Sequence, residues 1–172
     1  TLNGGFGSCL TLTAAAFLLN NEMHDFTSAP GKPNMFGLVQ GEANAIMPGK
    51  RMLSAMTPSI VLDPVGQLSM VLGTPGGPTI ITTVTQVILN VLDQRMLLAD
   101  AVAAPRFHHQ ALPDAIRAEQ GSLSDATIRA LQAMGHTVNM RGGSGTVAAI
   151  QKTAGGYVGV IDPRSAGSAL GY

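Results

Sequence analysis

A glycine-rich loop followed at once by an apolar helical pattern constrains this sequence more than any other feature. Residues 73–78 read GTPGGP. Apolar side chains then recur with helical spacing, at Ile80, Ile81, Val84, Val87, Ile88, Val91 and Leu92. Pro78 suits the first position of a helix, because the N–H that it lacks would have no intrahelical partner there. The spacing therefore predicts a loop that opens directly into a buried helix.

Such a loop presents unpaired backbone N–H groups beside the positive end of the helix dipole. Gly76 and Gly77 let the backbone adopt conformations that a side chain would hinder, and they let a ligand approach closely. The loop could hold a phosphate, a carboxylate or the oxyanion of an acyl-transfer reaction. It could equally be a tight strand-to-helix connection without a ligand. No lysine follows the glycines, which disfavours a P-loop for nucleotides.

Strand patterns precede and follow this loop. The apolar runs 59–62 and 68–72 flank the turn sequence DPVG at 63–66, which predicts a hairpin that delivers the chain to the glycines. Ser122 or Ser124 is the predicted N-cap of a helix through Met134. Other short helices and strands are predicted at residues 96–104, 115–119, 137–140, 147–152 and 157–162. The strand, turn, strand, glycine loop and helix form the clearest local architecture of the chain.

Polar residues gather near the start of the chain. Glu22 and Asp25 could present two carboxylates to one ligand, such as a substrate ammonium, although such clusters are more commonly turns whose side chains bind their own backbone. The apolar segment 10–19 is interpreted as a short strand or a buried segment, and the Gly/Pro-rich stretch 27–49 as a long irregular loop. Thr1 could act as a nucleophile with its own α-amino group as base, or the sequence could start there for an unrelated reason.

Composition narrows the functional classes. The length suits one domain spanning 1–172. Only 12% of the residues are charged and the formal net charge is zero, so the basic footprint of a nucleic-acid-binding protein is missing. No apolar run reaches the roughly 20 residues of a membrane helix, and the single cysteine, Cys9, excludes an internal disulfide framework. His108 and His109 have no third ligand at a suitable spacing, which favours a structural or surface role over a metal site.

Six stretches together give a specific resemblance that covers essentially the whole chain. They read TLN, LNNEMHDF, KRMLSAMTP, PGG, APRFHHQ and the ending from DPRS to GY, at residues 1–3, 19–26, 50–58, 75–77, 104–110 and 162–172. In order and approximate spacing they resemble the small subunit of γ-glutamyltranspeptidases, which belong to the N-terminal-nucleophile hydrolases. The resemblance implies an α+β fold, a four-layer αββα sandwich of which this chain supplies part.

The resemblance also implies a reaction and a set of residue roles. A precursor cuts itself into a large and a small subunit, and a threonine attacks the amide of glutathione or another γ-glutamyl compound to form an acyl-enzyme. Water, an amino acid or a peptide then accepts the acyl group, and no metal or cofactor takes part. Gly76 and Gly77 would form the oxyanion hole. The residues that would hold the amino-acid end of the substrate are Asn3, Glu22, Asp25 and Ser54.

Two departures from the family pattern leave alternatives open. The family has two serines where this chain has Ser54 and Ala55, so one hydrogen bond to the substrate carboxylate is missing, and a β-lactam (cephalosporin) side-chain acylase on the same fold is the alternative enzyme. Thr1 matches a second threonine that supports the nucleophile by hydrogen bonding, so we expect the nucleophile outside this chain unless Thr1 itself serves. A third alternative is a catalytically inactive structural or binding subunit. The resemblance further implies a large-subunit partner from the same precursor and a periplasmic or extracellular location.

Overall fold

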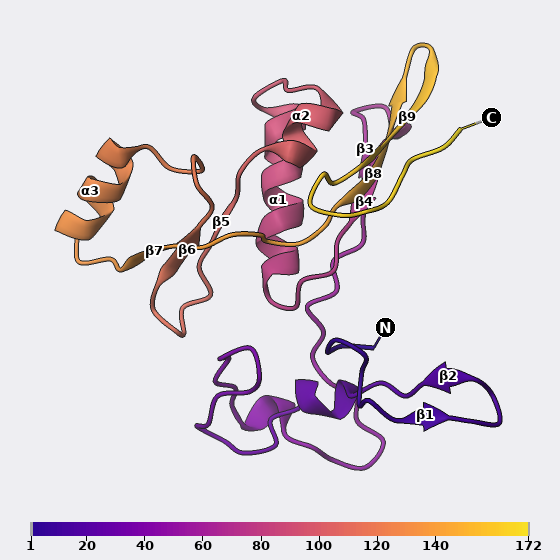
Figure 1. Cartoon of the computed structure of the whole chain (residues 1–172), viewed down its shortest axis with the longest axis vertical. Coiled ribbons are helices and arrows are strands. Elements are labelled where there is room, and N and C mark those ends of the chain that lie inside the picture. Colours follow the sequence, from indigo (N-terminus) through magenta and orange to yellow (C-terminus); the bar gives the residue numbers. More distant parts are fainter. Residues whose placement is uncertain (1, 172) are drawn as a thin grey trace. The chain divides into compact units, whose positions relative to one another are not determined.

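The computed structural model describes residues 2–171, which divide into two compact units. One unit runs to Ser54 and the other begins at Ala55 (Figure 1). Helices and strands both occur, as expected for an α+β protein. The assignment of residues 1–172 to a single domain stays a prediction. No helix within the described part of the chain is both long and apolar enough to cross a membrane.

A small hairpin begins the first unit. β1 (Thr11–Leu12) and β2 (Phe17–Leu18) pair in an antiparallel arrangement. The side chains of both strands are largely exposed; Phe17, for example, is 52% exposed. The apolar segment 10–19 therefore contains two short strands joined by a turn and is not a buried segment.

Two 3-10 helices, η1 (Glu22–Asp25) and η2 (Glu42–Asn44), lie in the rest of the first unit. The stretch 27–49 otherwise consists of turns and bends, as its glycines and prolines predict. The side-chain amide of Asn44 donates a hydrogen bond to the backbone carbonyl of Asp25, at 2.6 Å. This bond ties the long irregular stretch to the end of η1.

A four-stranded antiparallel sheet forms the centre of the second unit. In order across the sheet, its strands are β3 (Ser59–Leu62), β4 (Leu68–Gly73), β8 (Ala148–Thr153) and β9 (Gly156–Ile161). The N–H of Gly66 donates to the carbonyl of Asp63 at 2.9 Å and closes the turn between β3 and β4. The predicted hairpin of residues 59–62 and 68–72 is confirmed, and the predicted strands 147–152 and 157–162 pair as β8 and β9.

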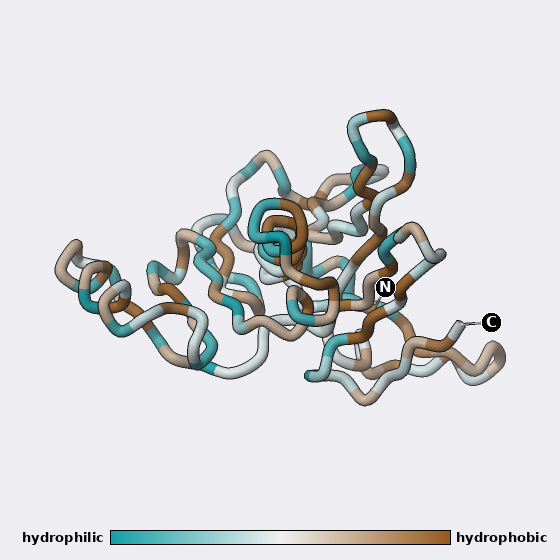
Figure 2. Tube along the Cα trace, turned by 90° about the horizontal axis from the view of Figure 1, so that it is seen from above, coloured by the Kyte–Doolittle hydropathy of each residue, from teal (hydrophilic) through white to brown (hydrophobic). Residues whose placement is uncertain are grey.

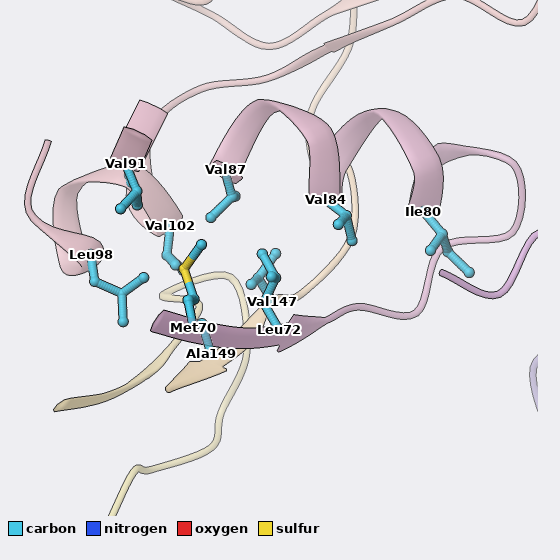
Figure 3. Packing of buried hydrophobic residues seen from close by; sticks show 11 residues of the cluster. Met70, Leu72, Ile80, Val84, Val87, Val91, Leu98, Val102, Val147 and Ala149 are labelled. Atoms are coloured by element: carbon cyan, nitrogen blue, oxygen red, sulfur yellow. The ribbon is translucent and has the colours of Figure 1, made fainter. Parts of the chain in front are cut away.

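The core lies between this sheet and two helices, α1 (Thr79–Leu92) and α2 (Leu98–Ala103). Figure 3 shows Val84 and Val87 of α1 pointing toward the β4 strand. The buried cluster consists of Met70, Leu72, Ile80, Val84, Val87, Val91, Leu98, Ala101, Val102, Val147 and Ala149. The members of this cluster that belong to α1 form a stripe along the helix. Their burial outweighs the strand preference of the β-branched residues of α1. Figure 2 looks along α1, whose turns carry both hydrophobic and hydrophilic residues.

The other face of the same sheet carries an apolar row. Ile60, Val71 and Ile150 are paired across β3, β4 and β8, so their side chains point to the same side, away from the core residues Met70 and Leu72. Ile60 is 71% exposed and Ile150 is 46% exposed. The second unit therefore has one sheet face packed under helices and one apolar face open.

A second, smaller sheet completes this unit. Its strands are β5 (Phe107–His108), β6 (Ile116–Ala118) and β7 (Val138–Met140), in which β6 and β7 are parallel. The crossover between β6 and β7 contains α3 (Asp125–Ala133). The Ser124 hydroxyl accepts a hydrogen bond from the Thr127 N–H, at 3.1 Å, so Ser124 is the N-cap.

Candidate active site

The glycine loop joins β4 to α1 and has a backbone that requires glycine. Gly76 has a φ of 149° and Gly77 a φ of 57°, both in the region that side chains disfavour. A Cβ on Gly76 would lie 2.5 Å from the hydroxyl oxygen of Thr79. Pro78 has helical dihedral angles and α1 begins at the next residue, as the sequence predicts. The loop is thus a tight turn into the helix in which a side chain at residue 76 would clash with Thr79.

The two glycines of this loop have hydrogen-bonded carbonyl groups and N–H groups that are unpaired within the described part of the chain. The carbonyl of Gly76 accepts hydrogen bonds from the Thr79 N–H at 3.2 Å and the Thr79 hydroxyl at 2.8 Å, and the carbonyl of Gly77 accepts from the Ile80 N–H at 3.1 Å. The N–H groups of Gly76 and Gly77 donate to no residue between 2 and 171. Gly76 is exposed and Gly77 is half-buried. Two unpaired donors beside a helix N-terminus can stabilise an anion.

A second group of predicted site residues gathers in the first unit. The Asn3 amide donates to Asp25 Oδ1 at 3.0 Å and lies 3.4 Å from the carbonyl oxygen of Asn21. Glu22 begins the same 3-10 helix that Asp25 ends. The Oε1 atom of Glu22 is buried and has no hydrogen-bond partner among the described residues. The structure therefore brings Asn3 and Asp25 together, with Glu22 one turn away.

The remaining predicted site residues belong to both units or lie outside the described residues. Ser54 is exposed at the end of the first unit, and the half-buried Ala55 begins the second. Thr1 lies outside the described residues. Gly76 and Gly77 belong to the second unit, whereas the predicted substrate-binding residues belong to the first. That all of them serve one substrate stays a prediction.

A buried cluster of charged side chains lies near the glycine loop in the second unit, and the sequence analysis assigned it no role. Arg106 is 1% exposed and its Nη2 donates to Asp162 Oδ2 at 2.6 Å. Arg164 contacts Asp162 at 3.0 Å and Glu119 at 2.5 Å. The sequence did contain a signal for these two arginines. Each directly follows a proline within a stretch that carries the family resemblance.

Both carboxylates of this cluster are held in the ionised form. Burial raises the pKa of Asp162, but hydrogen bonds from the N–H groups of Arg164 and Val147 and from the Arg106 side chain outweigh it, so the pKa lies below its ordinary value. Burial likewise raises the pKa of Glu119, and the Arg164 side chain and the Ser144 N–H lower it further than burial raises it. The cluster therefore stays charged at neutral pH.

The two adjacent histidines take different environments. His108 is 2% exposed, with Nδ1 2.7 Å from the Thr82 hydroxyl and Nε2 2.8 Å from Gln110 Oε1. Burial, together with the charges of Arg117 and His109, lowers the pKa of His108 despite the Gln110 hydrogen bond. His109 is exposed and pairs with Asp114. His108 is thus held inside the second unit by two side-chain contacts, and His109 lies at its surface.

The fold and the glycine loop define an α+β protein with two backbone N–H groups, unpaired among the described residues, at the start of a helix, and comparison with known proteins identifies its family. The sequence model of the family described as Gamma-glutamyltranspeptidase matches residues 1–172. The chain belongs to the gamma-glutamyltranspeptidase family.

Individual relatives agree with this assignment. The chain is 45% identical over 166 residues to the glutathione hydrolase proenzyme of Escherichia coli K12, which covers 96% of this chain and 28% of that protein. A crystal structure of gamma-glutamyltranspeptidase from Pseudomonas nitroreducens, complexed with L-DON, matches with a TM-score of 0.90 and 46% identity, over 100% of this chain and 90% of that one. A cephalosporin acylase from Bacillus halodurans has a TM-score of 0.79 at 23% identity, over 98% of this chain and 30% of that one, and shares the fold alone. The chain spans 28% to 32% of the length of its bacterial proenzyme relatives.

Proposed function

We propose that this chain is the small-subunit portion of a γ-glutamyl hydrolase and transferase that acts on glutathione and related γ-glutamyl amides. A threonine hydroxyl attacks the amide carbonyl, the amine leaves, and a γ-glutamyl ester remains on the enzyme. Water, an amino acid or a peptide then takes the acyl group. Thr1 supports the nucleophile in this scheme. We also propose a periplasmic or extracellular location, which only the family resemblance implies.

The observation that carries the proposal is the pair of unpaired N–H groups at Gly76 and Gly77. When the hydroxyl attacks, the carbonyl oxygen gains negative charge, and donors fixed in advance stabilise that charge without reorganising. Removing one such donor costs about 100- to 1,000-fold in kcat in enzymes of this type. The loop therefore supplies a large part of the rate enhancement that acyl transfer needs.

Recognition of the γ-glutamyl group is assigned to the first unit. The carboxylates of Glu22 and Asp25 complement the substrate ammonium, and the Asn3 amide orients Asp25 through its 3.0 Å hydrogen bond. The buried, unpaired Oε1 of Glu22 is an acceptor that a bound ammonium would satisfy. Ser54 donates to the substrate α-carboxylate.

The proposed partner is a large subunit from the same precursor. The open sheet face with Ile60, Val71 and Ile150 supports this, because an apolar row of this kind is costly to leave in water. A second sheet packed on that face would bury it and complete the αββα sandwich.

The decisive experiment measures hydrolysis of a γ-glutamyl anilide and of glutaryl-cephalosporin by the protein that contains this chain and the rest of its precursor. We expect turnover of the anilide and little or none of the cephalosporin. Gly76→Ala should lower kcat for the anilide by about 100-fold, since the loop would have to shift away from Thr79. Gly66→Ala is the matched control, because Gly66 also has a positive φ, of 82°, yet nothing lies within 4 Å of its Cβ position.

Two other outcomes would replace the proposal. Preferred turnover of glutaryl-cephalosporin would favour the acylase, which Ala55 motivates because a second serine is missing there. Binding of γ-glutamyl compounds without turnover of either substrate would favour a catalytically inactive binding subunit.

A further inference from the structure

We propose that the hydroxyl groups of Thr74 and Thr79 are positioning groups that aim the two N–H donors of the glycine loop; this rests on the proposed function of that loop. Each hydroxyl donates a hydrogen bond to a backbone carbonyl. Thr74 donates to the carbonyl of Pro75 at 2.7 Å, and Thr79 donates to the carbonyl of Gly76 at 2.8 Å.

Because of the geometry of the peptide bond, these two contacts determine the directions of the N–H donors. A trans peptide is planar, so its C=O and N–H groups point in opposite directions. The carbonyl of Pro75 shares a peptide plane with the N–H of Gly76, and the carbonyl of Gly76 shares a plane with the N–H of Gly77. Holding the two carbonyls therefore fixes the directions of both N–H groups. A peptide plane next to glycine rotates more easily than one next to another residue. The hydrogen bonds from the two threonine hydroxyls therefore matter more at this loop than they would elsewhere.

Thr74 is itself held by the segment that precedes β8. Its hydroxyl oxygen accepts a hydrogen bond from the Thr146 N–H at 2.8 Å. Gly145 makes this approach feasible, because it has a φ of 72° and a Cβ there would lie 2.5 Å from the Thr74 hydroxyl and 3.1 Å from the Pro75 carbonyl oxygen. The Thr74 hydroxyl thus bridges the glycine loop and a second backbone segment.

That segment is fixed in turn by the buried charged cluster. Glu119 Oε1 accepts from the Ser144 N–H at 2.7 Å, and Arg106 Nη1 donates to the Ser144 carbonyl at 2.7 Å. The Thr83 hydroxyl of α1 donates to the same carbonyl at 3.4 Å. A continuous set of contacts therefore runs from the charged cluster through Ser144 to Thr74 and the loop.

The two threonines should differ in effect. The carbonyl of Gly76 also accepts from the Thr79 backbone N–H, so it keeps one hydrogen bond when the hydroxyl is removed. The carbonyl of Pro75 accepts from no other described residue than Thr74. We expect loss of the Thr74 hydroxyl to be the more damaging change.

The test uses the complete enzyme and the γ-glutamyl anilide, with Thr74→Val, Thr79→Val and the conservative Thr74→Ser and Thr79→Ser. Thr74→Val should lower kcat by roughly 10- to 100-fold with KM within about threefold, because a misaimed donor affects the transition state more than substrate binding. Thr79→Val should cause a smaller loss, and both serine variants should restore activity. Thr85→Val is the matched control, because Thr85 is exposed and its hydroxyl donates only to the Ile81 carbonyl within α1, at 2.8 Å.

A second measurement does not depend on turnover. With selective ¹⁵N-glycine labelling, Thr74→Val should lower the NMR order parameter of the Gly76 amide, and Thr74→Ser should leave it unchanged. Gly145→Ala should produce the same disorder by another route if the valine variant does not assemble. Unchanged kcat and unchanged glycine order in the valine variants would overturn the positioning role. Absence of turnover by the wild-type enzyme, with glycine order lost in Thr74→Val, would instead refute the proposed reaction and leave the positioning intact.

Discussion

Replacing Asp162 by asparagine should severely destabilise the second unit. Asp162 is fully buried and both carboxylate oxygens are used. One accepts from Arg106 Nη2 at 2.6 Å and from the Val147 N–H at 3.0 Å, and the other accepts from the Arg164 N–H and Nη1, both at 3.0 Å. An asparagine amide has one acceptor oxygen and one NH₂ group, so in either orientation two donors face a donor.

The size of the expected loss in stability follows from the burial of the ion pair. Removing one partner of a buried ion pair costs about 3–5 kcal/mol, because the other charge stays buried without compensation. Arg106 would stay buried without its partner, because it is only 1% exposed. Arg164 is 21% exposed and would regain some hydration, so the expected cost lies at the lower end of that energy range. At about 2–4 °C per kcal/mol for a domain of about 150–250 residues, Tm should fall by about 10 °C.

The effect should also depend on pH. The folded pKa of Asp162 lies below its ordinary value of 3.8, so its stabilising contribution is complete above that value and is lost as the pH falls through the folded pKa. Asp162→Asn lacks this contribution at every pH. The difference in Tm between wild type and variant should therefore be constant near neutral pH and should narrow in acid, below about pH 4.

Thermal unfolding of the assembled protein at pH 7 and in an acid series measures both effects, and Asp100→Asn is the control because Asp100 is exposed on α2. The control should stay within about 0.5 kcal/mol of wild type. A Tm for Asp162→Asn equal to that of the control at pH 7 would refute the reasoning about uncompensated charge. A difference that widens in acid would refute the sign of the pKa shift.

Two smaller perturbations test other parts of the chain. Ser124→Ala removes the N-cap bond to Thr127 and should destabilise α3 by about 1 kcal/mol, seen as faster amide exchange confined to that helix, whereas Ser124→Asp should keep the protection. Ala55→Ser should lower KM for the γ-glutamyl anilide severalfold if one hydrogen bond to the substrate carboxylate is missing, since such a bond contributes about 0.5–1.5 kcal/mol. An unchanged KM would mean that another residue already fills this role.

Local patterns predicted the second unit well because its elements follow rules that act over a few residues. Of the periodic apolar residues of α1, the core buries Ile80, Val84, Val87 and Val91, whereas Ile81 and Leu92 are exposed. The Ser124 cap and the turn closed by Asp63 and Gly66 occur where the sequence places them. The predicted strand 68–72 forms as β4, on which Met70 and Leu72 are buried. In the first unit, apolar composition alone did not distinguish the exposed β1–β2 hairpin from a buried segment.

The charged cluster could not be predicted in the same way. Arg106 and Asp162 are 56 residues apart, and Glu119 and Arg164 are 45 apart, so no periodicity or spacing rule joins them. The contact between Asn3 and Asp25 joins residues 22 apart and was expected only through the family resemblance. Sequence patterns identified the loop that carries the candidate donors, but not the side chains that hold its peptide planes.

The buried charges bear more on geometry than on net stability. An ion pair recovers its desolvation cost only in part, and apolar residues of similar volume often stabilise a protein as well or better. Apolar residues could not, however, bind both the N–H and the C=O of Ser144, as Glu119 and Arg106 do. Fixing that peptide backbone sets the course of the residues that contact Thr74 at the glycine loop. A requirement for backbone direction beside the candidate oxyanion site thus explains a largely buried ionic cluster in a chain of which only 12% of residues are charged.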